Sequence, residues 1–144
     1  MNPETVRQWF IKADHDSKTA QDELNTENPA TDTVCFHMQQ CVEKYLKGFL
    51  AFHDQEIKKI HNLTAILVDC VQVDPSFSEL TAKQVDVLTP HATVLRYPDD
   101  FYIPPVEEAQ HAVQLAEDVK QFVLDKLQTQ GFTMGAEQHH DNTE

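Results

Sequence analysis

Residues 35–53 read CFHMQQCVEKYLKGFLAFH, and this stretch decides the fold. It holds no proline, and its one glycine, Gly48, lies well inside it. At the roughly 100° turn per residue of an α-helix, its apolar side chains cover a much wider arc than the stripe of a surface helix. The sequence therefore predicts a central, mostly buried helix of a bundle. The arc is formed by Val34, Cys35, Met38, Cys41, Val42, Tyr45, Leu46, Phe49, Leu50 and Phe52.

Four polar residues, His37, Gln40, Lys44 and Lys47, share the opposite arc of this helix, and we call them the helix-two strip. Two interpretations are open for the strip. It can be a solvated face, as most charged helix faces are, and spacing alone favours that interpretation. It can also recognise a phosphate, a nucleic acid or a partner subunit. Gln39 instead points into the apolar arc, where its amide needs hydrogen-bond partners.

The composition indicates one helical domain. The chain has 144 residues, 40% of them hydrophobic, and only three glycines, which disfavours sandwiches, barrels and glycine-rich phosphate loops. Further helices are expected from Pro3 to Leu24, from His61-Asn62 to before Asp74-Pro75, from Thr81 to Leu95, and from Pro104-Pro105 to Leu127. Thr81 and Gln84 have the spacing of a capping box, and Pro90 should kink that helix.

These elements predict an all-α, up-and-down four-helix bundle with one additional short helix, five helices in total. The bundle is expected to occupy residues 1–130. From Gly131 to Glu144 the chain is polar and acidic and lacks periodicity, so we expect a disordered tail there.

The charge and the cysteines bear on partners and location. A formal net charge of −13 and a pI near 4.8 oppose non-specific binding to nucleic acid. Any RNA contact would need a local basic patch or a partner. Cys35, Cys41 and Cys70 form no CxxC pair and occupy core-type positions, which predicts buried, reduced thiols in a cytoplasmic protein. No signal peptide is evident, and no apolar run is long enough to span a bilayer.

Three short patterns suggest chemistry. Glu108-x-x-His111 has the spacing that di-iron bundles use on a helix. Such proteins need a second pair of this kind, and the only other one here is Glu137-x-x-His140 in the expected tail. A surface pair is therefore the better interpretation, and no metal or cofactor is predicted. His61 at a helix start permits a phosphotransfer role, although Thr64 and Ala65 replace the lysine and glycine of such proteins. Arg96-Tyr97-Pro98 either ends a helix or grips a phosphate.

Several of these residues occur together in a known family. Trp9, Ala13 and Asp16 are followed by Cys35-Phe36-His37, Gln39-Gln40, Glu43-Lys44 and Leu46-Lys47, then by His61-x-Leu63 and Arg96-Tyr97-Pro98. This pattern, from about residue 2 to 127, resembles the HEPN family, the higher eukaryote and prokaryote nucleotide-binding domain. The resemblance implies a five-helix bundle that often forms homodimers. It also implies a bacterial stand-alone type, encoded beside a minimal nucleotidyltransferase as a toxin–antitoxin-like pair.

One branch of that family is ribonucleolytic and uses an arginine followed, after four to six residues, by a histidine. Neither Arg7 nor Arg96 has a histidine at that spacing. We therefore favour a non-catalytic, dimeric module that binds a nucleotide, RNA or a partner nucleotidyltransferase. Its expected binding residues are His37, Gln40, Lys44, Lys47, His61, Arg96 and Tyr97. The alternative is a metal-independent ribonuclease with a non-standard site, in which Arg96 stabilises phosphate charge and His37, His61 or His111 acts as the base.

Overall fold

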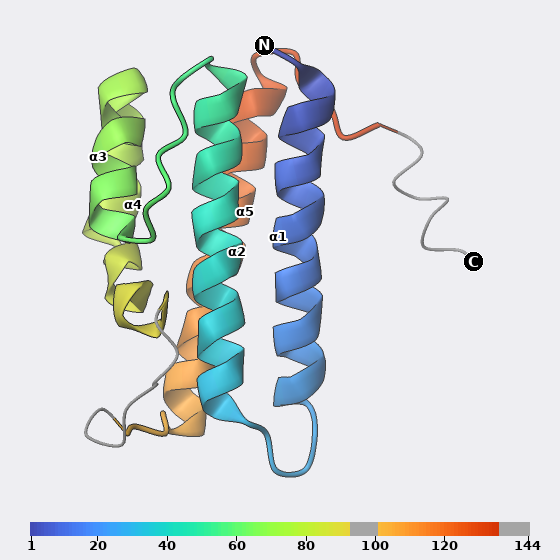
Figure 1. Ribbon diagram of the computed structural model, residues 1–144, viewed down its shortest axis with the longest axis vertical. Coiled ribbons are helices and arrows are strands. Elements are labelled where there is room, and N and C mark those ends of the chain that lie inside the picture. Colours follow the sequence, from blue (N-terminus) through green and yellow to red (C-terminus); the bar gives the residue numbers. More distant parts are fainter. Residues whose placement is uncertain (93–100, 136–144) are drawn as a thin grey trace.

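The computed structural model describes residues 1–92 and 101–135, and in this part of the chain the secondary-structure elements are all helices, without a strand (Figure 1). The all-α prediction is therefore confirmed. In chain order the elements are α1 (Pro3–Leu24), α2 (Thr31–Phe52), α3 (Leu63–Val73), the 3-10 helix η1 (Pro75–Phe77), α4 (Ser78–Ala82), the 3-10 helix η2 (Val85–Ala92) and α5 (Val106–Gln128).

Helix α2 is the centre of the molecule. Most of its residues between Thr31 and Leu50 are buried, as the wide apolar arc predicted. Helix α1 packs along one side of it, α5 along a second, and α3 with η2 along a third (Figure 1). The three long helices have 22, 22 and 23 residues, and the shorter elements form a layer on the side of α2 opposite α1.

Helices α1 and α2 approach closely because α1 presents small side chains to α2. Ala13, Ser17 and Ala20 are buried on the inner face of α1. Nearer the start of α1, the Phe10 ring lies directly against Gly48 of α2, where a Cβ atom would come within 2.9 Å of the ring atom Cδ1. Glycine is therefore required here by lack of space, and its weak helix propensity is the cost of the close packing.

The expected long fourth helix is not formed. Helix α4 ends at Ala82, and Gln84 adopts the left-handed conformation with φ 60°, which ends an α-helix. The chain then continues as η2, with Pro90 inside it. The predicted capping box is wrong for the same reason, since the Gln84 N–H donates to the Thr81 carbonyl at 2.9 Å in a helix-ending turn. Within residues 1–92 and 101–135, the bundle therefore has three long helices and a lateral layer of short ones.

The packed chain continues past residue 130, where the sequence placed the domain boundary. Phe132 is buried and its ring lies edge-on to Phe10, with 5.6 Å between centroids, and to Phe52. The Arg7 guanidinium lies over the Phe132 ring, 5.6 Å from the ring centre, and the Arg7 Nε donates to the Thr133 carbonyl at 3.0 Å. The rest of the expected tail, residues 136–144, lies outside the described residues.

Replacing Gly48 by alanine should lower the free energy of unfolding by about 1–3 kcal/mol, although alanine is the better helix former by about 1 kcal/mol. The added methyl group would overlap the Phe10 ring. That ring is buried and stacked on Tyr45, with centroids 4.9 Å apart, so it has no room to retreat. Urea denaturation followed by circular dichroism measures the change. In a Phe10→Leu background the cost of Gly48→Ala should shrink; an equal cost in both backgrounds would contradict the contact.

The three thiols should be nearly inert in the folded protein. Burial raises the pKa of Cys35 to about 12, with Glu108 and Asp32 adding to the effect, and burial also raises the pKa of Cys41 and Cys70. Because only the thiolate reacts, iodoacetamide should modify Cys35 very slowly at pH 8 and about tenfold faster for each pH unit, up to about pH 11. Unfolding in urea should restore ordinary rates. Mass spectrometry counts the modified thiols, and fast modification of the native protein at pH 8 would contradict this expectation.

Candidate functional site

The first part of the candidate site is a carboxylate shared between α1 and α2. Asp16 of α1 accepts a hydrogen bond from Lys44 Nζ at 2.6 Å and lies 2.8 Å from His37 Nδ1. We call these three residues the Asp16 cluster. The side chains of His37 and Lys44 are 26% and 25% exposed, and that of Asp16 is 12% exposed. The cluster therefore lies at the rim of the α1–α2 interface, with its carboxylate on the inner side.

The second part is a buried ion pair on the other side of α2. Lys47 Nζ lies 2.8 Å from Glu43 Oε2 one helical turn away, and the two side chains are only 7% and 5% exposed. His61 Nδ1 is 3.0 Å from both oxygens of Glu43, and Gln39 Nε2 donates to Oε1 at 3.2 Å. We call Glu43, Lys47, His61 and Gln39 the Glu43 cluster.

The Glu43 cluster also fixes the connection between α2 and α3, which runs back alongside α2 (Figure 1). Lys47 Nζ donates to the Ile60 carbonyl at 2.8 Å, and Gln39 Nε2 donates to the His61 carbonyl at 3.1 Å. Gln40 in turn donates to the Gln39 side-chain oxygen at 2.7 Å. These bonds supply the partners that the buried Gln39 amide was predicted to need. They place His61 at the entrance to α3, where Asn62 caps the helix by accepting from the Ala65 N–H.

The structure divides the predicted helix-two strip. His37 and Lys44 belong to the Asp16 cluster, and Gln40 lies half-buried beside Gln39. The prediction that Lys47 faces solvent with them is wrong, because the connection of residues 53–62 covers it and supplies a carbonyl acceptor. His61, predicted at the site from its position at a helix start, is joined to α2 through Glu43. Arg96 and Tyr97 lie outside the described residues.

Both clusters hold a histidine against a carboxylate, an arrangement that sets the chemistry of the ring. A carboxylate only accepts hydrogen bonds, so the Nδ1 atoms of His37 and His61 carry the hydrogen. In the neutral ring Nε2 is then a proton acceptor, as in histidines that serve as general bases. His61 has the more accessible ring, with 63% of its side chain exposed. The arrangement permits proton transfer at Nε2 in either cluster.

Two further clusters connect α5 to the rest of the bundle. Asp14 of α1 accepts from the Tyr45 hydroxyl and lies 3.2 Å from Lys120 Nζ of α5. Burial, and then the Asp14 carboxylate, raises the pKa of Tyr45, so this hydroxyl stays protonated and donates. These interactions join three helices, α1, α2 and α5.

The second of these clusters involves Glu108, which the sequence placed in a Glu-x-x-His pair. Its carboxylate accepts from the Tyr102 hydroxyl at 2.5 Å and lies 3.1 Å from His91 Nε2, whereas His111 is exposed. Among residues 1–92 and 101–135, no group of three or more His, Cys, Asp or Glu side chains is arranged to hold a metal ion. The helices of the same part of the chain include none that is both long and apolar enough to cross a membrane.

Sequence reasoning missed Asp16 and Glu43 as organising groups of the site. Asp16 is buried beside Ser17 on α1, although a carboxylate at a helical position usually faces solvent. A signal was present, because Ala13, Ser17 and Ala20 are small and predict close approach of a second helix along that side. Glu43 could have been recognised by its position four residues before Lys47 within a wide apolar arc, since buried charges need a partner.

Replacing Lys47 by methionine should lower the free energy of unfolding by about 2–4 kcal/mol, because it leaves the Glu43 carboxylate in the interior without its cation. The control is Lys18→Met, which breaks the exposed Lys18–Asp22 pair of 2.6 Å and should cost less than about 1 kcal/mol. Adding Glu43→Gln to Lys47→Met should recover part of the loss. Urea denaturation measures all three, and similar losses for Lys47→Met and Lys18→Met would show that the buried pair contributes little.

Comparisons with known proteins agree with the motif and the fold. The model of the HEPN domain matches residues 6–127. The crystal structure of TT1696 from Thermus thermophilus superposes with a TM-score of 0.65 at 28% sequence identity, over 84% of this chain and 97% of that one. ST0689, described as an archaeal HEPN homologue, superposes with a TM-score of 0.60 at 22% identity, over 84% and 96% of the two chains.

No curated protein matches the chain. The matched residues 6–127 nonetheless include both clusters and all the long helices except the first residues of α1 and the last residue of α5. They also include every residue quoted for the sequence pattern, from Trp9 to Pro98. The chain belongs to the HEPN domain family.

Proposed function

We propose that this protein is a non-catalytic HEPN module that acts as a dimer and binds a partner protein through the α1–α2 surface around the Asp16 cluster. The partner implied by the family resemblance is a minimal nucleotidyltransferase. A nucleotide or RNA would then be held by the assembled complex and not by this chain alone. The observation that carries the proposal is the charge compensation within the two clusters.

Each cation of the predicted site that the structure describes already has a carboxylate within hydrogen-bond distance. Lys44 is 2.6 Å from Asp16, and Lys47 is 2.8 Å from Glu43. The two histidines share the same carboxylates. A phosphate would have to compete with these carboxylates for Lys44 and Lys47, on a chain whose net charge is −13. Mixed polar groups with paired charges suit the rim of a protein interface better than a phosphate site.

The absence of the ribonuclease motif from the sequence supports a non-catalytic role. Arg7 is engaged elsewhere, at the contact with Phe132 and the Thr133 carbonyl. Phosphodiester cleavage by this family's chemistry needs a cation at the phosphate and a base at the 2′-hydroxyl, brought together at one place. Within the described residues, His37 and His61 offer a base, but their neighbouring lysines are paired with carboxylates.

One observation favours the alternative, a ribonuclease with a non-standard site. His37 and His61 each have a carboxylate on Nδ1, which is how general bases are oriented in many enzymes. Arg96 would have to supply the phosphate-binding charge. We therefore include RNA cleavage in the experiment below, where it separates the two functions.

The test uses the isotopically labelled full chain, titrated with ATP, with a short RNA and with a recombinant minimal nucleotidyltransferase, while the RNA is followed for cleavage. We expect the nucleotidyltransferase to shift amides of α1 and α2 around His37, Gln40 and Lys44 and the RNA to remain intact. Gln40→Ala combined with Lys44→Ala should weaken this binding about tenfold, since both side chains reach the surface.

The matched control for this experiment is Lys18→Ala combined with Asp22→Ala, which removes an exposed pair from another position on α1. Its affinity should stay within about twofold of the parent. Cleaved RNA, with cleavage abolished by His37→Ala or His61→Ala and by Arg96→Ala, would establish the ribonuclease instead. Binding of ATP or RNA by the chain alone, with shifts at Lys44, would show that a phosphate displaces Asp16 and would overturn the protein-partner proposal.

A further inference from the structure

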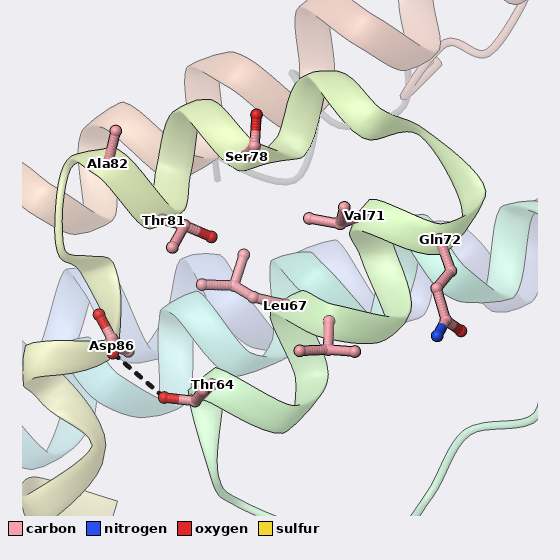
Figure 2. Close-up of a pocket in the computed structure, with 9 residues that line it drawn as sticks. Thr64, Leu67, Val71, Gln72, Ser78, Thr81, Ala82 and Asp86 are labelled. Atoms are coloured by element: carbon pink, nitrogen blue, oxygen red, sulfur yellow. Dashed lines mark hydrogen bonds between the residues drawn. The ribbon is translucent and has the colours of Figure 1, made fainter.

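A groove lies between α3 and α4 (Figure 2), which lie on the side of α2 opposite α1 (Figure 1). Its volume is about 490 Å³ and its lining is mostly apolar. Figure 2 shows the side chains of Leu67 and Val71 from α3 and Thr81 from α4 facing the space between the two helices. Val68 and Ala82 also line it. Neither cluster of the site described above contributes to it.

Helix α3 has more apolar surface than this chain covers. Its sequence, LTAILVDCVQV, has only three polar residues in eleven. Leu63, Ile66, Leu67 and Cys70 are buried, but Val68 is 51% exposed on the other side of the helix. Val68 stands among the polar residues Thr64 and Gln72 on the side of α3 away from the core, and all three line the groove. The groove side of α3 is therefore suited to be covered by another helix.

The polar groups of the groove show which kind of helix fits. Asp86, at the start of η2, stands at one end and accepts from the Thr64 hydroxyl through Oδ2 at 3.1 Å (Figure 2). Among the described residues, no lysine, arginine or histidine forms an ion pair with Asp86, although other carboxylates of the chain, such as Asp69 and Asp74, have lysine partners. A cation supplied from outside would complete this end of the groove.

We infer that the α3–α4 groove is a docking site for an amphipathic helix of a partner protein, with its apolar face against Val68 and Val71, above the buried Leu67, and a lysine or arginine at Asp86. This is the helix-in-groove mode of recognition, with anchors one and two turns apart. Helix α3 is about 16 Å long at 1.5 Å per residue, so the groove accommodates about three turns of a bound helix.

Charge complementarity favours such a basic helix over a second copy of this chain. The chain carries a net charge of −13, so two copies repel each other unless their contact faces are locally complementary. A second copy would also bring its own Asp86 near the first across a two-fold interface centred on the groove. A basic amphipathic helix is instead attracted by the same acidic field that opposes a second copy at this groove.

The test titrates the labelled full chain with a synthetic helical peptide of about 14 residues that has leucines on one face and lysines on the other. A peptide of identical composition, with the leucines scattered around the helix, is the control probe. We expect saturable binding at about 100 μM or tighter for the first peptide only, with amide shifts confined to α3, α4 and the start of η2.

The variants separate the groove from the general acidity of the surface. Val68→Asn should weaken binding about fivefold or more, because it places an amide in the apolar contact. Val106→Asn, at a valine that is 41% exposed outside the groove, should leave binding within about twofold. Asp86→Asn keeps an acceptor for Thr64 but removes the charge, so it should weaken binding at low salt and make little difference at high salt.

Equal binding of the two peptides, shifts spread over α1 and α5, or no saturable binding by about 1 mM would overturn the proposal. Sedimentation of the protein alone tests the second copy. A dimer that Val68→Asn converts to monomer would show that this chain covers its own groove, which also overturns the proposal. A dimer that Val68→Asn leaves intact would show that dimerisation uses another surface and leaves the groove free, as the proposal requires. The peptide and the nucleotidyltransferase are tested on different surfaces, so the groove and the proposed function can fail independently.

Discussion

Nearly complete burial of α2 is the constraint on which the rest of this structure depends. A helix with so wide an apolar arc must be covered on several sides, and α1, α5 and the layer of α3 with η2 each cover one. The same burial requires that polar groups on α2 be paired. Glu43 and Lys47 satisfy each other one turn apart, and their remaining hydrogen-bonding capacity holds the connection to α3. The burial of α2 thus explains both the helices that pack around it and the pairing of its charged side chains.

Much of the fold could be predicted because its signals are local. The start of α1 at Pro3, the cap of α3 at Asn62 and the opening of α5 after Pro105 follow from residues next to the helix ends. The prediction of a long fourth helix was wrong because Gln84 adopts a positive φ, which ends the helix. A glycine at this position would have indicated such a conformation, but a glutamine does not. Hydrophobic periodicity alone could not distinguish a bundle of three long helices and a lateral layer of short ones from a bundle of four long helices.

The candidate site was less predictable because its partners are distant in the sequence. Helical spacing correctly grouped His37 with Lys44, but it could not show that Asp16, 21 residues before His37, lies between them. It also placed Lys47 in solvent, since the position of the connection that covers it depends on tertiary packing. Spacing thus identified a polar face of α2, and only the fold shows that its charges are already compensated. Because Lys44 and Lys47 are already paired with carboxylates, a protein partner is favoured over a free phosphate.

The inertness of the buried thiols has a practical consequence for measuring motion and assembly. Cys35, Cys41 and Cys70 are all enclosed by the bundle, so they need not be replaced before a reactive dye or spin label is attached elsewhere. A single cysteine introduced at an exposed position, such as Lys18 on α1 or Gln114 on α5, would carry the label selectively. Distances between labels in such derivatives would report how copies and partners are arranged, with the native interior undisturbed.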